Sequence, residues 1–223
     1  MTGIEKKSSE DLLLELVIEY FIKEGSPVGS KFLFDVEWIN MAPSTIRKYL
    51  NILEKKWLVY QPYNSSWRIP TKEWINTYLL SIIPQKKYDI VVINKKFNLR
   101  WFVEKISELV DSVVFGYFED ENNMNYLGIS QILKKVNNDI EKIIPLMQFI
   151  EKQEVISYLK KKNIEKWKIN YSFVNYEWVN IALMYIKVKF EWKDAIIWTL
   201  WSLRVDYKKN IDVLKRILEK WKI

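Results

Sequence analysis

One short segment of the sequence is rich in cationic side chains, which are the residues best suited to bind an anionic partner. Residues 38–72 carry six Lys or Arg and a single acid, Glu54, whereas residues 1–37 carry eight Asp or Glu and four Lys. Guanidinium and ammonium groups bind phosphate oxygens, and Arg also contacts base edges through paired hydrogen bonds. Such a segment suits a nucleic-acid partner, but a charged loop beside a solvated helix face would have the same composition.

Apolar residues at helical spacing predict the elements that would position these cations. The pattern indicates amphipathic helices over residues 8–25, 29–38 and 39–57, a β-hairpin within 58–71 and a further helix over 72–83. Three helices followed by a hairpin is the order of a winged helix-turn-helix. In that fold the third helix enters the major groove, and the hairpin lies along the DNA backbone.

The third predicted helix has an apolar stripe and an opposite polar face. Pro43 suits its first position, where a missing N–H costs nothing, while Ala42 before it offers no side-chain cap. Hydroxyl groups at this N-terminus would bind phosphate together with backbone N–H groups. The predicted DNA-binding residues lie on the second helix, the third helix and the hairpin: Lys31, Ser44, Thr45, Arg47, Lys48, Asn51, Tyr63, Asn64, Ser65, Ser66 and Arg68. A winged helix that binds another protein is the alternative.

Several classes of function are disfavoured by what the sequence lacks. The 223 residues include no Cys and no His, which removes thiolate metal sites and the commonest general base. No catalytic constellation or cofactor motif is found, so we predict no enzyme, no cofactor and no metal site. No apolar run reaches the roughly 18 residues of a membrane helix, and no signal peptide precedes the first helix. We therefore expect a cytoplasmic, nucleoid-associated protein with no membrane partner.

The second half of the chain has the pattern of an α/β domain. Asp206 is expected to cap the last helix, and Asn170, Asn175 and Asn180 are expected at turns or sheet edges. The predicted fold class is α+β, with one domain over residues 1–82 and another over 88–223. The predicted strands of the second domain cover residues 88–95, 112–118, 179–191 and 194–203, and its helices cover 98–110, 139–162 and 207–220.

Three segments of the first half resemble the N-terminal domain of the heat-inducible transcription repressor HrcA family. They are EYFIKEGSPVGSKFL, APSTIRKYLNILEKKWLVYQPYNSSWRIPT and KEWINTYLL, within residues 12–80. The segment beginning YLGIS and the segment containing Arg204, Asp206 and Tyr207 resemble the family more weakly. The family pattern is longer in its middle, where an inserted domain associated with dimerisation is missing here. Tyr63 and Lys48 also replace the His and Asn of the family pattern, which leaves room for a different operator sequence.

The resemblance implies a winged helix followed by a GAF-like domain. It also implies a bacterial repressor of class I heat-shock, or chaperone, operons that binds an inverted-repeat operator, the CIRCE element. The implied partners are double-stranded DNA, a second copy of the chain and the chaperonin, and a palindromic operator favours a homodimer on geometric grounds as well. A ligand-sensing winged-helix regulator and a degenerate protein-interaction module without operator binding are the alternatives.

Tryptophan stands where glycine is expected. The chain has 11 Trp and 5 Gly, although Gly usually makes up about 7% of residues. Six tryptophans align with glycines of the family pattern: Trp38, Trp57, Trp67, Trp74, Trp198 and Trp201. Our hypothesis is that UGA codons read as Gly in the source organism stand here as Trp. Genuine tryptophans of the core or of the DNA-facing surface are the alternative, and UGG codons at these positions would establish it.

Overall fold

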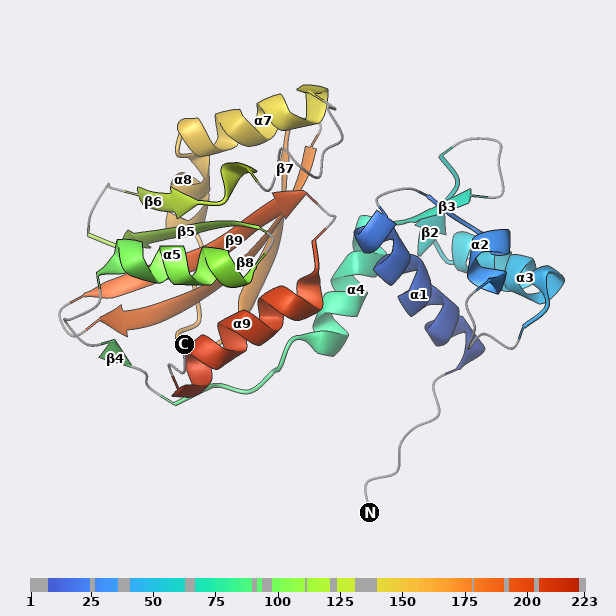
Figure 1. The fold of residues 1–223 in the computed structure, drawn as a ribbon, viewed down its shortest axis with the longest axis horizontal. Coiled ribbons are helices and arrows are strands. Elements are labelled where there is room, and N and C mark those ends of the chain that lie inside the picture. The colour runs from blue at the N-terminus through green and yellow to red at the C-terminus, as the bar shows by residue number, and fades with distance from the viewer. Residues whose placement is uncertain are drawn as a thin grey trace, which may run out of the picture. The chain divides into compact units, whose positions relative to one another are not determined.

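The computed structural model describes most of the chain as two compact units, Met1–Ile82 and Ile83–Ile223. The described residues are 8–24, 27–35, 41–62, 67–89, 92–93, 98–110, 112–120, 124–130, 140–177, 179–190, 193–202 and 205–220. Helices and strands occur in both units (Figure 1), so the predicted α+β class is confirmed. No helix within these ranges is long and apolar enough to cross a membrane.

The described part of the first unit contains four helices and a small antiparallel sheet. In this sheet β3 pairs with β1 on one side and with β2 on the other. The register joins Gly29 to Trp67 and Val59 to Pro70. The elements in chain order are α1 (Ser9–Glu24), β1 (Val28–Gly29), α2 (Ser30–Phe34), α3 (Pro43–Lys55), β2 (Val59–Tyr60), β3 (Trp67–Pro70) and α4 (Lys72–Ile82).

Side-chain caps fix two helix starts of the first unit. The Asp11 backbone N–H donates to Ser8 Oγ at 3.1 Å before α1, and the Trp74 N–H donates to Thr71 Oγ1 at 3.2 Å before α4. Both caps follow from residue type, because Ser and Thr oxygens accept from the first-turn N–H groups that have no partner inside the helix. The predicted second helix is shorter than expected: α2 ends at Phe34, and residues 36–40 lie outside the described ranges.

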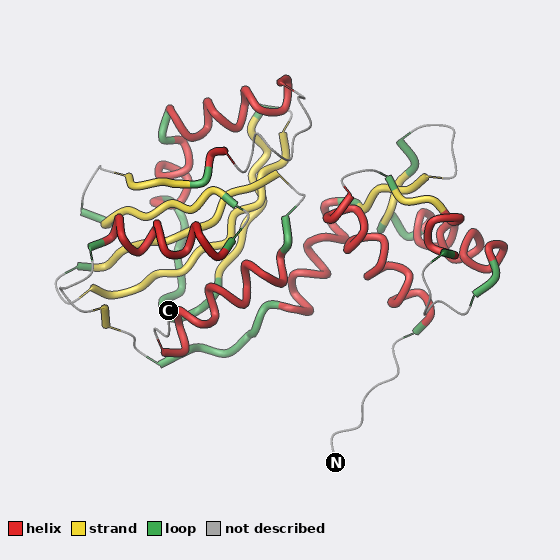
Figure 2. The backbone as a smooth tube through the Cα atoms, viewed as in Figure 1, coloured by secondary structure: helices red, strands yellow, loops and turns green. Residues whose placement is uncertain are grey.

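The second unit is built on a twisted sheet whose strands are yellow in Figure 2. The strand order is β4-β8-β9-β5-β6, and β7 pairs with β8 on the same side as β4. Among the strand pairs of the described residues, only β4–β8 is parallel. Its elements in chain order are β4 (Val92–Ile93), α5 (Leu99–Leu109), β5 (Val113–Phe118), β6 (Met124–Leu127), α7 (Ile140–Glu151), α8 (Glu154–Lys160), β7 (Asn170–Tyr176), β8 (Val179–Phe190), β9 (Asp194–Ser202) and α9 (Tyr207–Lys220).

Helices α5 and α9 cover one face of this sheet, as Figure 1 shows. A Cβ added at Gly116 of β5 would lie 2.8 Å from Val103 Cγ2, so a glycine allows α5 to approach the strand closely. Asn210 of α9 donates from Nδ2 to Ser112 Oγ at 2.8 Å and to Thr199 Oγ1 at 3.4 Å. The chain therefore anchors its last helix on β9 through a buried polar contact.

Aromatic rings fill the opposite face of the sheet. Trp198 of β9 is 0% exposed, stacks on Phe115 with ring centroids 5.1 Å apart, and meets Tyr117 edge to face at 5.5 Å. Burial raises the pKa of the Tyr117 hydroxyl to about 12, with a smaller contribution from the charge of Glu119. Phe149 of α7 contacts Tyr176 of β7 on this face, at 5.1 Å between centroids. The Phe149–Tyr176 contact therefore packs α7 against β7 on this face of the sheet.

The prediction of one continuous helix over residues 139–162 is wrong. The structure divides it into α7 and α8, with Gln153 between them at a φ of 53°. A positive φ cannot continue a right-handed helix, and Gln gives no sequence signal for it. Two further strands, β6 and β7, were not predicted. Asn170 begins β7, and Asn175 pairs with Asn180 across β7 and β8, as expected for residues at the edge of a sheet.

Tryptophan occupies a glycine position at the end of α3. Trp57 has a φ of 58°, its N–H donates to the Glu54 carbonyl at 2.9 Å, and the Leu58 N–H donates to the Leu53 carbonyl at 3.0 Å. These bonds form a Schellman motif, whose left-handed residue is usually Gly. Trp167 also has a positive φ, of 62°. The backbone at Trp57 and Trp167 therefore supports the hypothesis that these two positions are glycine in the source organism.

The other tryptophans differ from these two. Trp67 lies in extended strand β3 and is 46% exposed, whereas Trp74 of α4 and Trp198 are buried. Trp38 and the side chain of Trp201 lie outside the described residues. Both buried rings pack as core tryptophans do, but their Nε1–H groups find no hydrogen-bond partner among the described residues, which is unusual for a buried tryptophan. The aligned positions therefore differ. Trp57 has a left-handed backbone and an exposed ring, Trp67 has an extended backbone, and Trp74 and Trp198 have buried rings.

Replacing Trp57 by Gly is expected to raise the free energy of unfolding of the first unit by about 1 kcal/mol. The left-handed backbone is strained for any residue with a Cβ, and the indole, 79% exposed, loses little packing on removal. Urea unfolding followed by far-UV circular dichroism measures the change. Trp57→Ala is the matched control, because it removes the indole but keeps the strain. Equal gains from both substitutions would contradict the backbone explanation.

Candidate nucleic-acid interface

Helix α3 separates its buried and polar residues as the sequence predicts. Ile46, Leu50 and Leu53 are buried against the rest of the first unit, with 0%, 2% and 0% exposure. Pro43 occupies the first turn, and Ala42 is the N-cap residue without a side-chain hydrogen bond. The apolar stripe therefore orients the helix, because burial fixes which face points to solvent.

The face opposite this stripe is polar and cationic. Ser44, Arg47, Lys48 and Asn51 are exposed, and Thr45 is half-buried. The Arg47 guanidinium donates from Nε to the Pro43 carbonyl at 3.4 Å, a long contact within the helix that leaves the rest of the fork facing solvent. The structure thus brings five of the predicted residues together on one helix, where they can contact phosphates or base edges.

The remaining predicted residues lie on α2 and on the β2–β3 connection. Lys31 of α2 is exposed. Tyr63, Asn64, Ser65 and Ser66 lie outside the described residues. The hairpin strands on either side of this connection carry exposed aromatic rings, Tyr60 and Trp67, which sequence reasoning did not include in the candidate site. Aromatic residues are common on protein surfaces that bind nucleic acids. The presence of these two rings in the predicted hairpin was the sequence signal that could have identified them.

Arg68 does not give the hairpin a cationic tip, as the sequence had suggested. The residue is 7% exposed, its guanidinium pairs with Glu54 at 2.8 Å, and its Nη2 donates to Asn51 Oδ1 at 3.0 Å. Arg68 therefore joins β3 to the third helix. Glu54 was the single acid of the basic segment, and that contrast was the only sequence signal for this ion pair.

Replacing Arg68 by Ala is expected to lower the free energy of unfolding by about 2 kcal/mol. The substitution leaves the Glu54 carboxylate and the Asn51 carboxamide without their partner, and Glu54 is partly exposed, which limits the penalty. Urea denaturation of the chain measures it. The double variant Arg68→Ala/Glu54→Ala serves as the control, since it removes both charges and should recover part of the loss. No difference between wild type and Arg68→Ala would contradict a structural role.

Replacing Ala42 by Ser is expected to stabilise the first unit by about 1 kcal/mol. Ala42 has the extended backbone of an N-cap residue, with φ −63° and ψ 149°, but no oxygen to accept from the first turn. Thermal unfolding measures the gain. Ala42→Val is the control, because it adds side-chain atoms without an acceptor, and a similar gain from Val would disprove capping.

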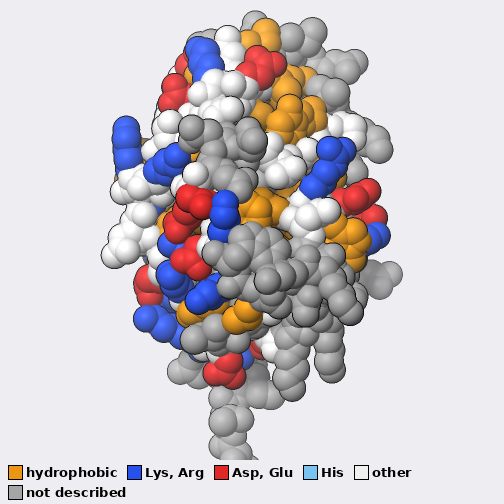
Figure 3. All heavy atoms as spheres, turned by 90° about the vertical axis from the view of Figure 1, so that its left-hand side faces the viewer, with side chains coloured by type: hydrophobic (Ala, Val, Ile, Leu, Met, Phe, Trp, Pro, Cys, Tyr) orange, Lys and Arg blue, Asp and Glu red, His pale blue; other side chains and the backbone are white. Residues whose placement is uncertain are grey.

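Ion pairs neutralise much of the charge at the strand ends of the second unit. Lys187 pairs with Glu119 at 2.6 Å, and Lys193 pairs with Asp120 at 3.0 Å. Lys166 pairs with Asp194 at 2.7 Å. The molecular face in Figure 3 shows basic and acidic side chains intermixed. A mixed-sign surface such as this face attracts a polyanion only weakly.

No family model matches the chain. It is similar to heat-inducible transcription repressors HrcA from Phytoplasma mali, at 32% identity over 108 residues, and from Syntrophobacter fumaroxidans, at 34% over 86 residues. The HrcA of Lactobacillus delbrueckii subsp. bulgaricus is 26% identical over 131 residues. These matches cover 44%, 39% and 53% of this chain, but only 32%, 24% and 38% of the respective relatives.

One solved structure shares the fold over almost the whole chain. It is the crystal structure of a hypothetical protein, with a TM-score of 0.71, 14% sequence identity, and coverage of 97% of this chain and 96% of that one. At this identity the likeness concerns the fold alone. It indicates that both units and their order along the chain occur together in another protein.

Proposed function

From the premise that the chain belongs to the HrcA family, we propose that it is a DNA-binding transcriptional repressor of class I heat-shock operons. It acts in the cytoplasm, on DNA that carries the inverted-repeat CIRCE operator. One observation supports this proposal most strongly: α3 exposes Ser44, Arg47, Lys48 and Asn51 together, while its other face is buried. A helix presenting donors and cations in this way suits the major groove.

The first unit serves as a winged helix-turn-helix. Its order of three helices and a β2–β3 hairpin supports this assignment, with α3 as the recognition helix. Arg47 contacts base edges or phosphates, Lys48 and Lys31 contact phosphates, and Ser44 and Thr45 bind a phosphate at the N-terminus of α3. Residues 63–66, predicted from the sequence to contact DNA, lie outside the described residues. Arg68 positions the wing against Asn51 and so acts on DNA only through its neighbours.

The second unit serves as a GAF-like regulatory and dimerisation domain. Its mostly antiparallel sheet with helices on both faces supports this assignment. An inverted-repeat operator presents two equal half-sites, so two copies of the chain bind it as a homodimer. The chaperonin is the proposed modulating partner, as implied by the family resemblance.

The test compares two DNA duplexes at physiological salt. Fluorescence anisotropy measures the affinity of the full chain for a duplex carrying the CIRCE repeat and for a scrambled duplex of the same composition, and light scattering gives the mass in solution. We expect a dimer that prefers the repeat at least about 1,000-fold and binds less tightly as salt rises. Equal, weak binding by a monomer would refute the repressor and favour a protein-interaction module.

A further inference from the structure

The segment that follows α4, residues 83–88, is bound to the second unit, and we call it the connector. Its Tyr88 N–H donates to the Trp167 carbonyl at 2.8 Å, and the Tyr88 side chain is only 8% exposed. Helix α4 ends at Ile82, so residues 83–87 alone separate the last helix of the first unit from this anchored tyrosine. The chain between the two units is therefore not a free linker.

Ion pairs on the surface surround the anchored tyrosine. Lys86 Nζ lies 3.1 Å from Glu219 Oε1 in the last turn of α9, and 4.7 Å from the centroid of the Tyr88 ring. Lys87 Nζ lies 3.8 Å from Glu165 Oε2. Exposed pairs of this kind contribute little to stability. The buried ring and the backbone hydrogen bond therefore hold the connector, and the charges help to position it.

The anchor depends on the ring and the main chain of Tyr88. Its hydroxyl is buried and has no hydrogen-bond partner among the described residues. Burial and the charge of Glu219 raise the pKa of this hydroxyl, so it stays neutral at physiological pH. Trp167 accepts through its carbonyl, so the bond needs no side chain at position 167. Phenylalanine at position 88 should keep the connector docked, whereas alanine should release it.

The connector is also short and conformationally restricted. Pro84 has a fixed φ and limits the conformation of the residue before it. Gln85 donates from Nε2 to the Ile83 carbonyl at 3.1 Å, and Ile83 is 4% exposed. Residues 83–87 would span at most roughly 18 Å when fully extended, and these restraints shorten that reach. A Gly/Ser linker, in contrast, behaves as a flexible coil.

We propose that the docked connector determines which spacing between operator half-sites the protein accepts. This inference rests on the proposed function, because it requires a homodimer on an inverted repeat. Two linked binding modules gain affinity only when the linker spans the distance between their sites, and a stiff linker fits fewer distances. Half-sites change direction as well as distance with spacing, since the duplex turns once in roughly 10 base pairs. Tyr88 acts here as a positioning residue and does not contact DNA.

The first measurement needs no DNA. NMR follows hydrogen exchange of the Tyr88 amide in the full chain, because a hydrogen-bonded amide exchanges only when the structure opens locally. We expect protection of at least about 100-fold in the wild type and in Tyr88→Phe, and at least about tenfold less in Tyr88→Ala. An unprotected Tyr88 amide in the wild type would overturn the inference, independently of any DNA result.

The second measurement varies the spacing of the CIRCE half-sites. Fluorescence anisotropy gives the affinity for the natural repeat, for a repeat lengthened by about half a turn, or roughly 5 base pairs, and for a single half-site. We expect the wild type and Tyr88→Phe to prefer the natural spacing at least about tenfold. Tyr88→Ala should lose at least about threefold of that preference and keep its affinity for the single half-site.

The outcomes separate this inference from the proposed function. An equal spacing preference in the wild type and in folded Tyr88→Ala, or no preference in the wild type, would overturn the inference and leave the repressor standing. A wild type that binds the natural repeat no better than a scrambled duplex would refute the repressor and the inference together.

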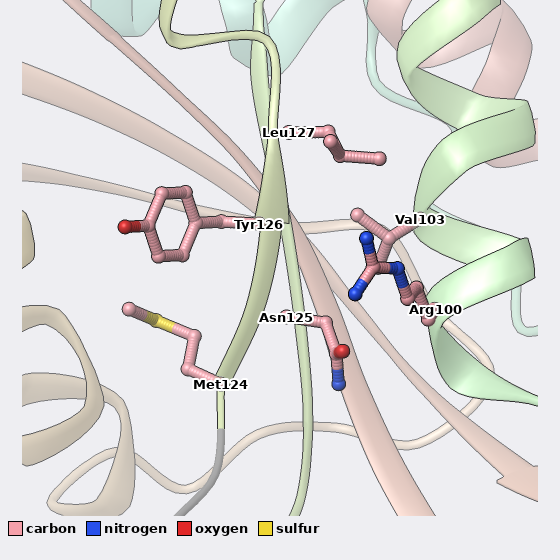
Figure 4. A pocket seen from close by; sticks show the side chains of 6 residues that line it. All are labelled: Arg100, Val103, Met124, Asn125, Tyr126 and Leu127. Atoms are coloured by element: carbon pink, nitrogen blue, oxygen red, sulfur yellow. The ribbon is translucent and has the colours of Figure 1, made fainter.

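Two further variants control for folding and for the loss of a ring. Tyr126→Ala should change neither measurement, because this ring is 43% exposed on β6 and points away from α5 (Figure 4). The double variant Lys86→Glu/Lys87→Glu turns both exposed ion pairs into repulsions and removes no buried atoms. It tests the inference even if Tyr88→Ala does not fold, and it should lower the spacing preference about threefold. An unchanged preference in the double variant, or an equal loss in Tyr126→Ala, would contradict the role of the connector.

Discussion

Replacement of Trp198 by Gly is expected to lower the free energy of unfolding of the second unit by about 5 kcal/mol. The indole is 0% exposed and contacts Phe115 and Tyr117, so its loss removes buried apolar surface and leaves a cavity. Glycine in the middle of a strand adds roughly 0.5–1 kcal/mol through its larger backbone entropy. A loss of this size is a large fraction of the stability of an ordinary domain.

Urea unfolding followed by far-UV circular dichroism measures this change without depending on tryptophan fluorescence. Trp67→Gly is the matched control, because that ring is 46% exposed and should contribute little. Trp198→Phe keeps a ring on Phe115 and should lose much less than Gly, which gives a measurable variant if the glycine variant does not fold. A glycine variant as stable as the wild type would contradict the packing argument. It would also support the codon hypothesis at position 198.

Replacement of Arg47 by Ala is expected to weaken binding to the operator duplex about 10- to 100-fold. Arg47 is exposed on α3, and a bidentate contact with a base contributes about 1–3 kcal/mol of discrimination. Binding to the scrambled duplex should weaken less, because only the phosphate-dependent part of the affinity is lost there. Anisotropy titrations of both duplexes at several salt concentrations measure the two effects.

Stability and charge need separate controls in this experiment. Among the described residues, the Arg47 side chain forms a hydrogen bond only from Nε to the Pro43 carbonyl, at 3.4 Å, so Arg47→Ala should unfold at nearly the same urea concentration as the wild type. Arg216→Ala removes one exposed positive charge from the second unit and controls for net charge. An equal loss of affinity for both duplexes would mean that Arg47 contacts only phosphates. No loss on either duplex would place the interface away from α3.

Sequence reasoning succeeded where local chemistry determines structure. The starts of α1 and α4 follow from Ser8 and Thr71, and the cap of α9 follows from Asp206, whose Oδ1 accepts the Lys209 N–H at 2.9 Å. The buried stripe of α3 follows from a 3.6-residue period. In each case one residue type or one spacing is sufficient, because the interaction joins neighbours along the chain.

Sequence reasoning failed where a contact joins residues far apart in the sequence, or where the residue type does not indicate the backbone conformation. The burial of Arg68 depends on Asn51, 17 residues earlier, and a hairpin pattern does not reveal which partner a cation meets. The break at Gln153 needs a left-handed backbone that the residue type does not announce. Strand β7 was missed because polar residues interrupt its apolar pattern, and its pairing with β8 compensates for that weakness.

The position of β9 in the sheet has a consequence for synthesis of the protein. This strand, the last in the chain, lies between β8 and β5, and its register joins Leu200 to both Leu183 and Val113. Before β9 leaves the ribosome, the β5–β6 pair and the β7–β8 pair cannot be joined, and the inner edges of β5 and β8 lack their partner strand. Unpaired edges of this kind favour aggregation, whereas the first unit, complete by Ile82, can fold much earlier. We therefore expect the interval between emergence of Ile82 and Ser202 to be when the nascent chain most needs protection.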